Sequence, residues 1–104
     1  MTHPRHQLDD LLSHPVRFSI AALLAVSDRA DFSFVRDQIE ISDSMLSKQM
    51  SALERAGYVN VRKAFVGKRG RTWLSLTSEG RRTFDRHLAA LHTIAQSNPA
   101  TPLA

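Results

Sequence analysis

Positive side chains without acidic neighbours are the groups in this sequence best suited to chemistry with a partner. Between Arg55 and Ser78 there are six lysines and arginines and no acid, and three of the six cluster at Lys68, Arg69 and Arg71. Ammonium and guanidinium groups form charge-assisted hydrogen bonds with phosphate oxygens, so the cluster predicts affinity for a polyanion. The alternative role of these three cations is to keep an exposed sheet edge from aggregating, but a hairpin tip rarely needs three cations for that purpose.

Residues 43–57 are predicted to form a helix that is capped by Ser42 and ended by Gly57. Apolar residues recur at helical spacing along one side, and the opposite side has no large aliphatic residue and no acid at its centre. A small, polar and cationic helix face suits entry into a DNA major groove about 12 Å wide. The candidate contacts of this helix with bases or backbone are Ser44, Met45, Ser47, Lys48, Gln49, Ser51 and Arg55.

Two β-rich runs, 58–66 and 72–76, flank a glycine-containing tip at 67–71 and predict a β-hairpin. Arg62 and Lys63 point to opposite faces of the first strand, so at most one of them serves the same surface as the preceding helix. Contact with phosphate or with a minor groove is the expected role of the tip. The candidate contacts of the hairpin are Lys63, Lys68, Arg69 and Arg71.

Further helices must hold these two parts in place, and the sequence predicts four of them, at 7–12, 16–26, 33–40 and from Thr77 or Ser78 to about residue 96. The third begins with Ser33 as its N-cap, and Phe32 or Phe34 packs against its start. The connection at Ile41 and Ser42 is so short that the next helix must turn sharply, which is the helix-turn-helix pattern. The expected fold class is therefore mainly α with a small β-hairpin, α+β.

Three side chains have two interpretations each. Met45 contacts a thymine methyl group or fills a gap in the core. Arg17 lies in the first turn of its helix, where the dipole disfavours a cation, so it binds phosphate or pairs with an acid. Trp73 is expected to pack on the hairpin in preference to stacking on single-stranded bases.

Composition and charge limit the size, location and domain organisation of the chain. A chain of 104 residues with 42% hydrophobic residues is long enough for one domain. The sequence contains no cysteine, which excludes disulfides and thiol chemistry and suits a cytoplasmic location. Residues 1–54 carry five bases and eight acids, a formal charge of −3, whereas residues 55–104 carry nine bases and two acids, or +7. We expect a disordered stretch at 1–6, the domain at 7–96 and a flexible tail at 97–104.

Other function classes find little support in the sequence. No apolar run is long enough to span a membrane and residues 1–10 do not form a signal peptide. There is no glycine-rich phosphate loop and no supported pair or triad of catalytic groups, so we expect no enzyme activity and no cofactor. The histidine spacings, such as His87 with His92, do not suit a metal site, and we expect these to be surface or interface residues.

The order of helices and hairpin resembles the winged helix-turn-helix regulators of the MarR/ArsR type, and most of all the small single-domain winged helix DNA-binding proteins of bacteria and archaea. The motifs that carry the likeness cover roughly residues 8–92: LLSHPVRFSIAALL (11–24), DFSFVRDQIEISDSMLSKQMSALERAGYV (31–59), VRKAFVGKRGRTWLSLTSEGR (61–81) and FDRHLAAL (84–91). Gly80, which is unfavourable early in a helix, fits this family pattern.

The resemblance implies a homodimeric transcriptional regulator, with repression as the expected effect, in which the helix at 43–57 reads the major groove of duplex DNA. It implies that the tip at 67–71 meets the minor groove or backbone, and that the terminal helices form the dimer. The apolar stripes of these terminal helices are larger than the core of one chain needs. The residues expected at the dimer interface are Leu8, Leu11, Leu12, Phe84, Leu88, Leu91 and Ala95. Two-fold symmetry then predicts a palindromic operator.

A winged helix module for protein–protein contact, without DNA binding, is the alternative function. Such a module usually lacks the cationic wing and the polar helix face that this chain keeps. Because the chain is short for a separate ligand domain, a small-molecule effector would have to bind at the dimer interface, or control would come from the amount of protein.

Overall fold

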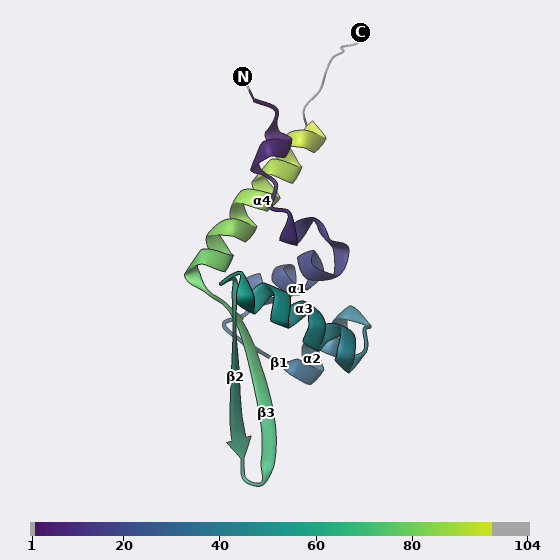
Figure 1. Ribbon diagram of the computed structural model, residues 1–104, viewed down its shortest axis with the longest axis vertical. Coiled ribbons are helices and arrows are strands. Elements are labelled where there is room, and N and C mark those ends of the chain that lie inside the picture. Colours follow the sequence, from purple (N-terminus) through teal and green to yellow (C-terminus); the bar gives the residue numbers. More distant parts are fainter. Residues whose placement is uncertain (1, 97–104) are drawn as a thin grey trace.

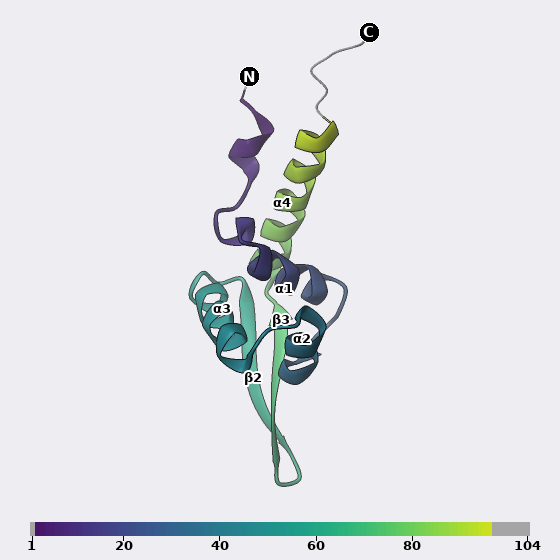
Figure 2. The ribbon, with the colours of Figure 1, turned by 90° about the vertical axis from the view of Figure 1, so that its right-hand side faces the viewer.

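The computed structural model describes residues 2–96 and confirms a mainly helical fold with a β-hairpin wing (Figure 1). Its elements are α1 (Pro15–Ala25), β1 (Ala30–Asp31), α2 (Phe32–Ile39), α3 (Asp43–Arg55), β2 (Val59–Val66), β3 (Arg69–Leu76) and α4 (Ser78–Gln96), preceded by 3-10 helices at Pro4–Gln7 and Leu11–Ser13. The strands form an antiparallel sheet in the order β1-β3-β2. Both views show the β2–β3 hairpin projecting from one end of the helical body and α4 from the other (Figures 1 and 2).

The hydrophobic core lies where α1, α2 and α3 meet the base of the sheet. Each buried aliphatic side chain contributes about 1.5–3 kcal/mol relative to an exposed one, so these contacts determine where α3 sits. Among the larger aliphatic side chains, the most deeply buried are Leu12, Ile20, Leu24, Val35, Leu46, Leu53, Val59 and Leu74.

Helix α2 begins earlier than predicted. Asp31, and not Ser33, is its N-cap, because the Asp31 carboxylate accepts the N–H of Ser33 at 3.1 Å. Pairing of β1 with β3 holds Asp31 in the extended conformation that an N-cap requires. Phe32 packs against the core, whereas Phe34 is exposed.

The turn between α2 and α3 is as tight as the sequence predicts. Glu40 adopts a left-handed conformation with φ of 60°, and the N–H of Ile41 donates to the carbonyl of Arg36 at 3.2 Å. Ser42 then caps α3 by accepting the N–H of Met45 at 3.1 Å. Gly57 follows α3 with φ of +83°, which confirms Ser42 as the cap and Gly57 as the stop residue, although the helix itself ends at Arg55, two residues earlier than predicted.

The N-terminal segment differs from the prediction. A 3-10 helix at Pro4–Gln7 replaces the disorder expected there, and a 3-10 helix at Leu11–Ser13 replaces the predicted helix at 7–12. The side chain of Asp9 accepts the N–H of Leu12 at 3.2 Å, and the N–H of Ser13 donates to the carbonyl of Asp10, three residues back, at 3.3 Å, which is the 3-10 bonding pattern. The tail at 97–104 lies outside the described residues.

The start of α4 is fixed against the end of α3 by close backbone contact. Thr77, one of the two predicted caps, accepts the N–H of Gly80 at 2.9 Å and donates to the carbonyl of Gly57 at 2.6 Å. A Cβ on Gly80 would lie 2.0 Å from the carbonyl oxygen of Tyr58. Glycine at this position therefore has a packing role that helix propensity does not reveal.

Candidate nucleic-acid interface

Helix α3 is held at a defined angle to α2 by its first residue. Arg36, in the last turn of α2, donates to Asp43 at 2.8 Å and to Asp37 at 2.9 Å. The Arg36 hydrogen bond holds the pKa of the Asp37 carboxyl below its usual value. All three groups are accessible to solvent, so the pairs orient α3 more than they stabilise the fold.

The outward face of α3 is polar and accessible. Leu46, Met50 and Leu53 point into the core as predicted, and Met45 is 37% exposed, so its side chain is available to a partner. The remaining candidates that the structure places at the surface of this helix are Ser44, Ser47, Lys48, Ser51 and Arg55.

The prediction that Gln49 lies on this face is wrong, because its side chain is only 5% exposed. It lies three residues after Leu46 and four before Leu53, on the side of α3 that the core covers. Its side-chain oxygen accepts from Arg17 at 2.9 Å, and Arg17 also donates to the carbonyl of Leu11 at 2.6 Å. Arg17 therefore contacts neutral groups and ties α3 to the N-terminal segment, which neither sequence interpretation foresaw.

The wing has a shorter tip than predicted. Val66 pairs with Arg69, so a two-residue turn at Gly67 and Lys68 joins the strands. Gly67 has φ of +65°, as the first central position of a type II′ turn requires. Lys68, Arg69 and Arg71 are all exposed, with the two arginines already in β3.

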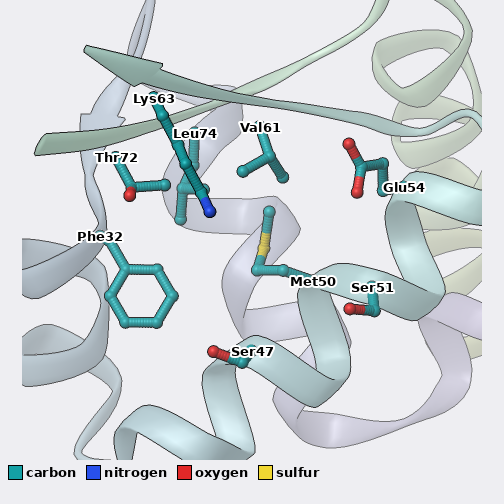
Figure 3. A pocket seen from close by; sticks show the side chains of 9 residues that line it. All are labelled: Phe32, Ser47, Met50, Ser51, Glu54, Val61, Lys63, Thr72 and Leu74. Carbon is teal, nitrogen blue, oxygen red and sulfur yellow. The ribbon is translucent and has the colours of Figure 1, made fainter.

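A hollow of about 410 Å³ separates α3 from the wing. Figure 3 shows Lys63 extending from β2 into this space, above Met50. Hydroxyl groups from both sides line it, from Ser47 and Ser51 on α3 and from Thr72 on β3, while Glu54 lies at one edge (Figure 3). Three hydroxyls and an ammonium group are suited to hydrogen bonds with phosphate oxygens.

Two of the residues predicted for a dimer interface belong instead to the core of one chain. Leu12 is 2% exposed and Phe84 is 6% exposed, because the N-terminal segment folds back and packs against α1 and α4. The other five stay partly or largely accessible, with Leu91 37% exposed: Leu8, Leu11, Leu88, Leu91 and Ala95.

His87 is also buried, at 2% exposure, where the sequence predicted a surface or interface residue. Its Nδ1 accepts the N–H of Asp9 at 2.9 Å, and its ring lies 5.6 Å from that of Phe18. The hydroxyl of Tyr58 donates to the Asp9 carboxylate at 2.7 Å, and burial, with that hydrogen bond, raises the pKa of Tyr58 to about 12. This network joins α4, the N-terminal segment and the start of the wing.

Acidification is expected to destabilise the fold through His87. Burial lowers the pKa of His87 from its ordinary 6.5, and the nearby Asp9 carboxylate only partly opposes this. The unfolded chain therefore takes up the proton near pH 6.5 and the folded chain only at lower pH, so the unfolding free energy falls as pH drops below about 6.5. Urea unfolding between pH 7.5 and pH 5 measures this.

His87→Leu should flatten that pH dependence, because it removes the titrating group, while His92→Leu on the exposed side of the same helix should leave it intact. An identical pH dependence in the wild type and His87→Leu would contradict the assignment.

Comparisons with known proteins add to this geometry. The family model described as Winged helix DNA-binding domain matches residues 16–95. An uncharacterised protein of Methanocaldococcus jannaschii is 27% identical over 73 residues, 70% of this chain and 79% of that protein. The structure of the transcriptional regulator homologue protein from Pyrococcus horikoshii OT3 is 25% identical, with a TM-score of 0.85 over 96% of this chain and 100% of that one.

A more distant structure, the PcaV transcriptional regulator from Streptomyces coelicolor, is 22% identical with a TM-score of 0.70 over 79% of this chain and 60% of that one, which shows a shared fold. Within residues 2–96, no helix is long and apolar enough to cross a membrane. In the same part of the chain, no three His, Cys, Asp or Glu side chains are grouped to hold a metal ion.

Proposed function

This chain belongs to the family of winged helix DNA-binding domains, and we propose that it acts as a homodimeric repressor that recognises a palindromic DNA sequence. The winged helix family and fold that the resemblance implies are confirmed. Sequence-specific recognition, the dimer and repression are the parts that we propose.

The observation that carries the proposal is the accessible polar face of α3 beside a cationic wing. Lys48 and Arg55 on α3 and Lys68, Arg69 and Arg71 on the wing are all exposed. Phosphate contacts from the wing would supply salt-dependent affinity, while α3 would supply the choice of sequence through base edges. The hollow between α3 and the wing, which is lined with hydroxyl groups, is suited to bind the DNA backbone that separates the major groove from the minor groove.

The other end of the molecule supports a dimer. Helix α4 extends away from the body on the side opposite the wing (Figure 2). Its accessible apolar residues, with Leu8 near Leu91 in one hollow, and the accessible Leu11 would be covered by a second copy. A two-fold axis there would place two α3 helices about 34–36 Å apart, one turn of DNA.

The Lys68→Ala/Arg69→Ala variant tests the DNA-binding proposal. It should bind duplex DNA more weakly and with a shallower salt dependence, because the logarithmic salt slope falls by about 0.9 for each phosphate that the protein no longer neutralises. Fluorescence anisotropy on labelled genomic fragments across a salt series measures this, and the saturation point should give two chains per duplex.

Arg82→Ala/Arg86→Ala is the matched control, because it removes the same charge from exposed positions on α4. It should keep the wild-type slope. Absence of DNA affinity in the wild type at low salt would overturn the proposal and favour a protein–protein module.

A further inference from the structure

The two faces of the wing differ in charge. Residues paired directly across β2 and β3 share a face, so Lys63 and its partner Thr72 lie on the side that lines the hollow beside α3. Arg62, paired with Trp73, lies on the opposite face, where the register also places Arg69 and Arg71. One strand pair therefore turns one cation toward α3 and three away from it.

A fourth arginine joins that face from another part of the chain. The guanidinium of Arg29, in the segment before β1, lies 4.0 Å from the centroid of the Trp73 ring. The guanidinium of Arg71 lies 5.7 Å from the same centroid. The indole therefore holds two cations that come from separate elements. We call Arg29, Arg62, Arg69, Arg71 and Trp73 the outer wing face.

Within residues 2–96, the outer wing face carries more positive than negative charge. Among residues 2–96, neither ion pair involves any of its four arginines. Asp31 pairs in register with Trp73, but its carboxylate accepts the N–H of Ser33 as the cap of α2. The four arginines outnumber the Asp31 carboxylate that the register places on the same face, so the net positive charge attracts a polyanion, and the planar guanidinium is suited to bind phosphate.

We propose that the outer wing face binds the phosphate backbone on the far side of the minor groove, the strand more distant from α3. The minor groove is about 6 Å wide, so a hairpin tip that enters it presents one face to each backbone. Lys63 faces the nearer strand and the arginines face the farther one. Stacking on Trp73 also restricts the Arg29 side chain before DNA arrives, which lowers the entropy cost of binding.

This inference rests on the proposed binding of duplex DNA. It extends the stretch of DNA that each chain contacts, outward from α3 and past the minor groove. Its test uses Trp73, the chain's one tryptophan, as a fluorescent reporter on the surface in question. Two duplexes are compared, both selected from a random pool with the wild-type chain. One ends where the wing enters the minor groove, and the other is longer by about half a helical turn, ~5 base pairs, at each end.

The longer duplex should bind more tightly and change the Trp73 emission, whereas the shorter one should leave the emission nearly unchanged. Arg29→Ala should forfeit most of the affinity that the extension adds, and its logarithmic salt slope on the longer duplex should fall by about 0.9 for each phosphate left without its cation. Arg86→Ala, an exposed arginine on α4, should behave as the wild type does. Circular dichroism confirms that both variants fold.

The inference would be overturned if the longer duplex raised the affinity of the wild type and of Arg29→Ala equally. It would also be overturned if the Trp73 emission did not change on the longer duplex. Either result would leave the proposed function standing. Failure of the wild type to bind either duplex would overturn both.

Discussion

Lys48→Glu is expected to abolish sequence-specific DNA binding while leaving the fold intact. Lys48 is exposed on α3, four residues after Ser44 and three before Ser51, at the centre of the outward face. Inside a groove bounded by phosphates a carboxylate there would be repelled. Like-charge juxtaposition at an interface costs several kcal/mol, so we expect affinity for the selected operator to fall at least about a hundredfold.

The measurement is anisotropy on the selected duplex and on a scrambled one, with sedimentation equilibrium on the same samples. Specific binding should disappear and the dimer should persist, because Lys48 lies on α3 and not on α4. Arg82→Glu makes the same charge reversal on α4 and should retain specific binding. If Lys48→Glu still distinguishes the two duplexes, α3 is not the element that reads sequence.

Local patterns in the sequence were sufficient to predict this part of the molecule. Ser42 and Gly57 define the ends of α3 through contacts within a few residues, and the spacing of Leu46, Met50 and Leu53 reports the buried side directly. The wing was predictable for the same reason, since hairpin pairing is local and Gly67 permits the turn. The sequence predicts a broader tip than the observed two-residue turn, because the polar residues Arg69 and Arg71 hide the start of β3.

The wrong predictions for Gln49, His87 and Phe84 concern contacts between distant segments. The sequence predicts an accessible Gln49 because its partner, Arg17, comes from another helix 32 residues away and leaves no local signal. His87 bonds to Asp9 across 78 residues, and this contact turns an apparently exposed side of α4 into core. A periodic stripe on a terminal helix shows that something covers it, but not whether the cover is the same chain or a second one. Phe84 is covered by the same chain.

Gly80→Ala is expected to destabilise the fold strongly, although alanine is the better helix former by about 1 kcal/mol. The added Cβ would lie 2.0 Å from the carbonyl oxygen of Tyr58, 2.8 Å from its carbonyl carbon and 2.9 Å from its Cα. These are backbone atoms, and the same carbonyl accepts the N–H of Thr77 at 3.0 Å, so the clash cannot be relieved by a change of rotamer. Overpacking of this kind costs about 1–3 kcal/mol and sometimes more.

Urea unfolding followed by circular dichroism should therefore show Gly80→Ala at a clearly lower midpoint than the wild type. Gly70→Ala is the matched control, because its Cβ would meet only the Phe65 ring at 3.7 Å, an ordinary contact. An unchanged or raised midpoint for Gly80→Ala would mean that α4 does not approach Tyr58 this closely. Because Tyr58 lies between α3 and β2, the same displacement would shift the wing relative to α3, and DNA affinity should fall even where the variant remains folded.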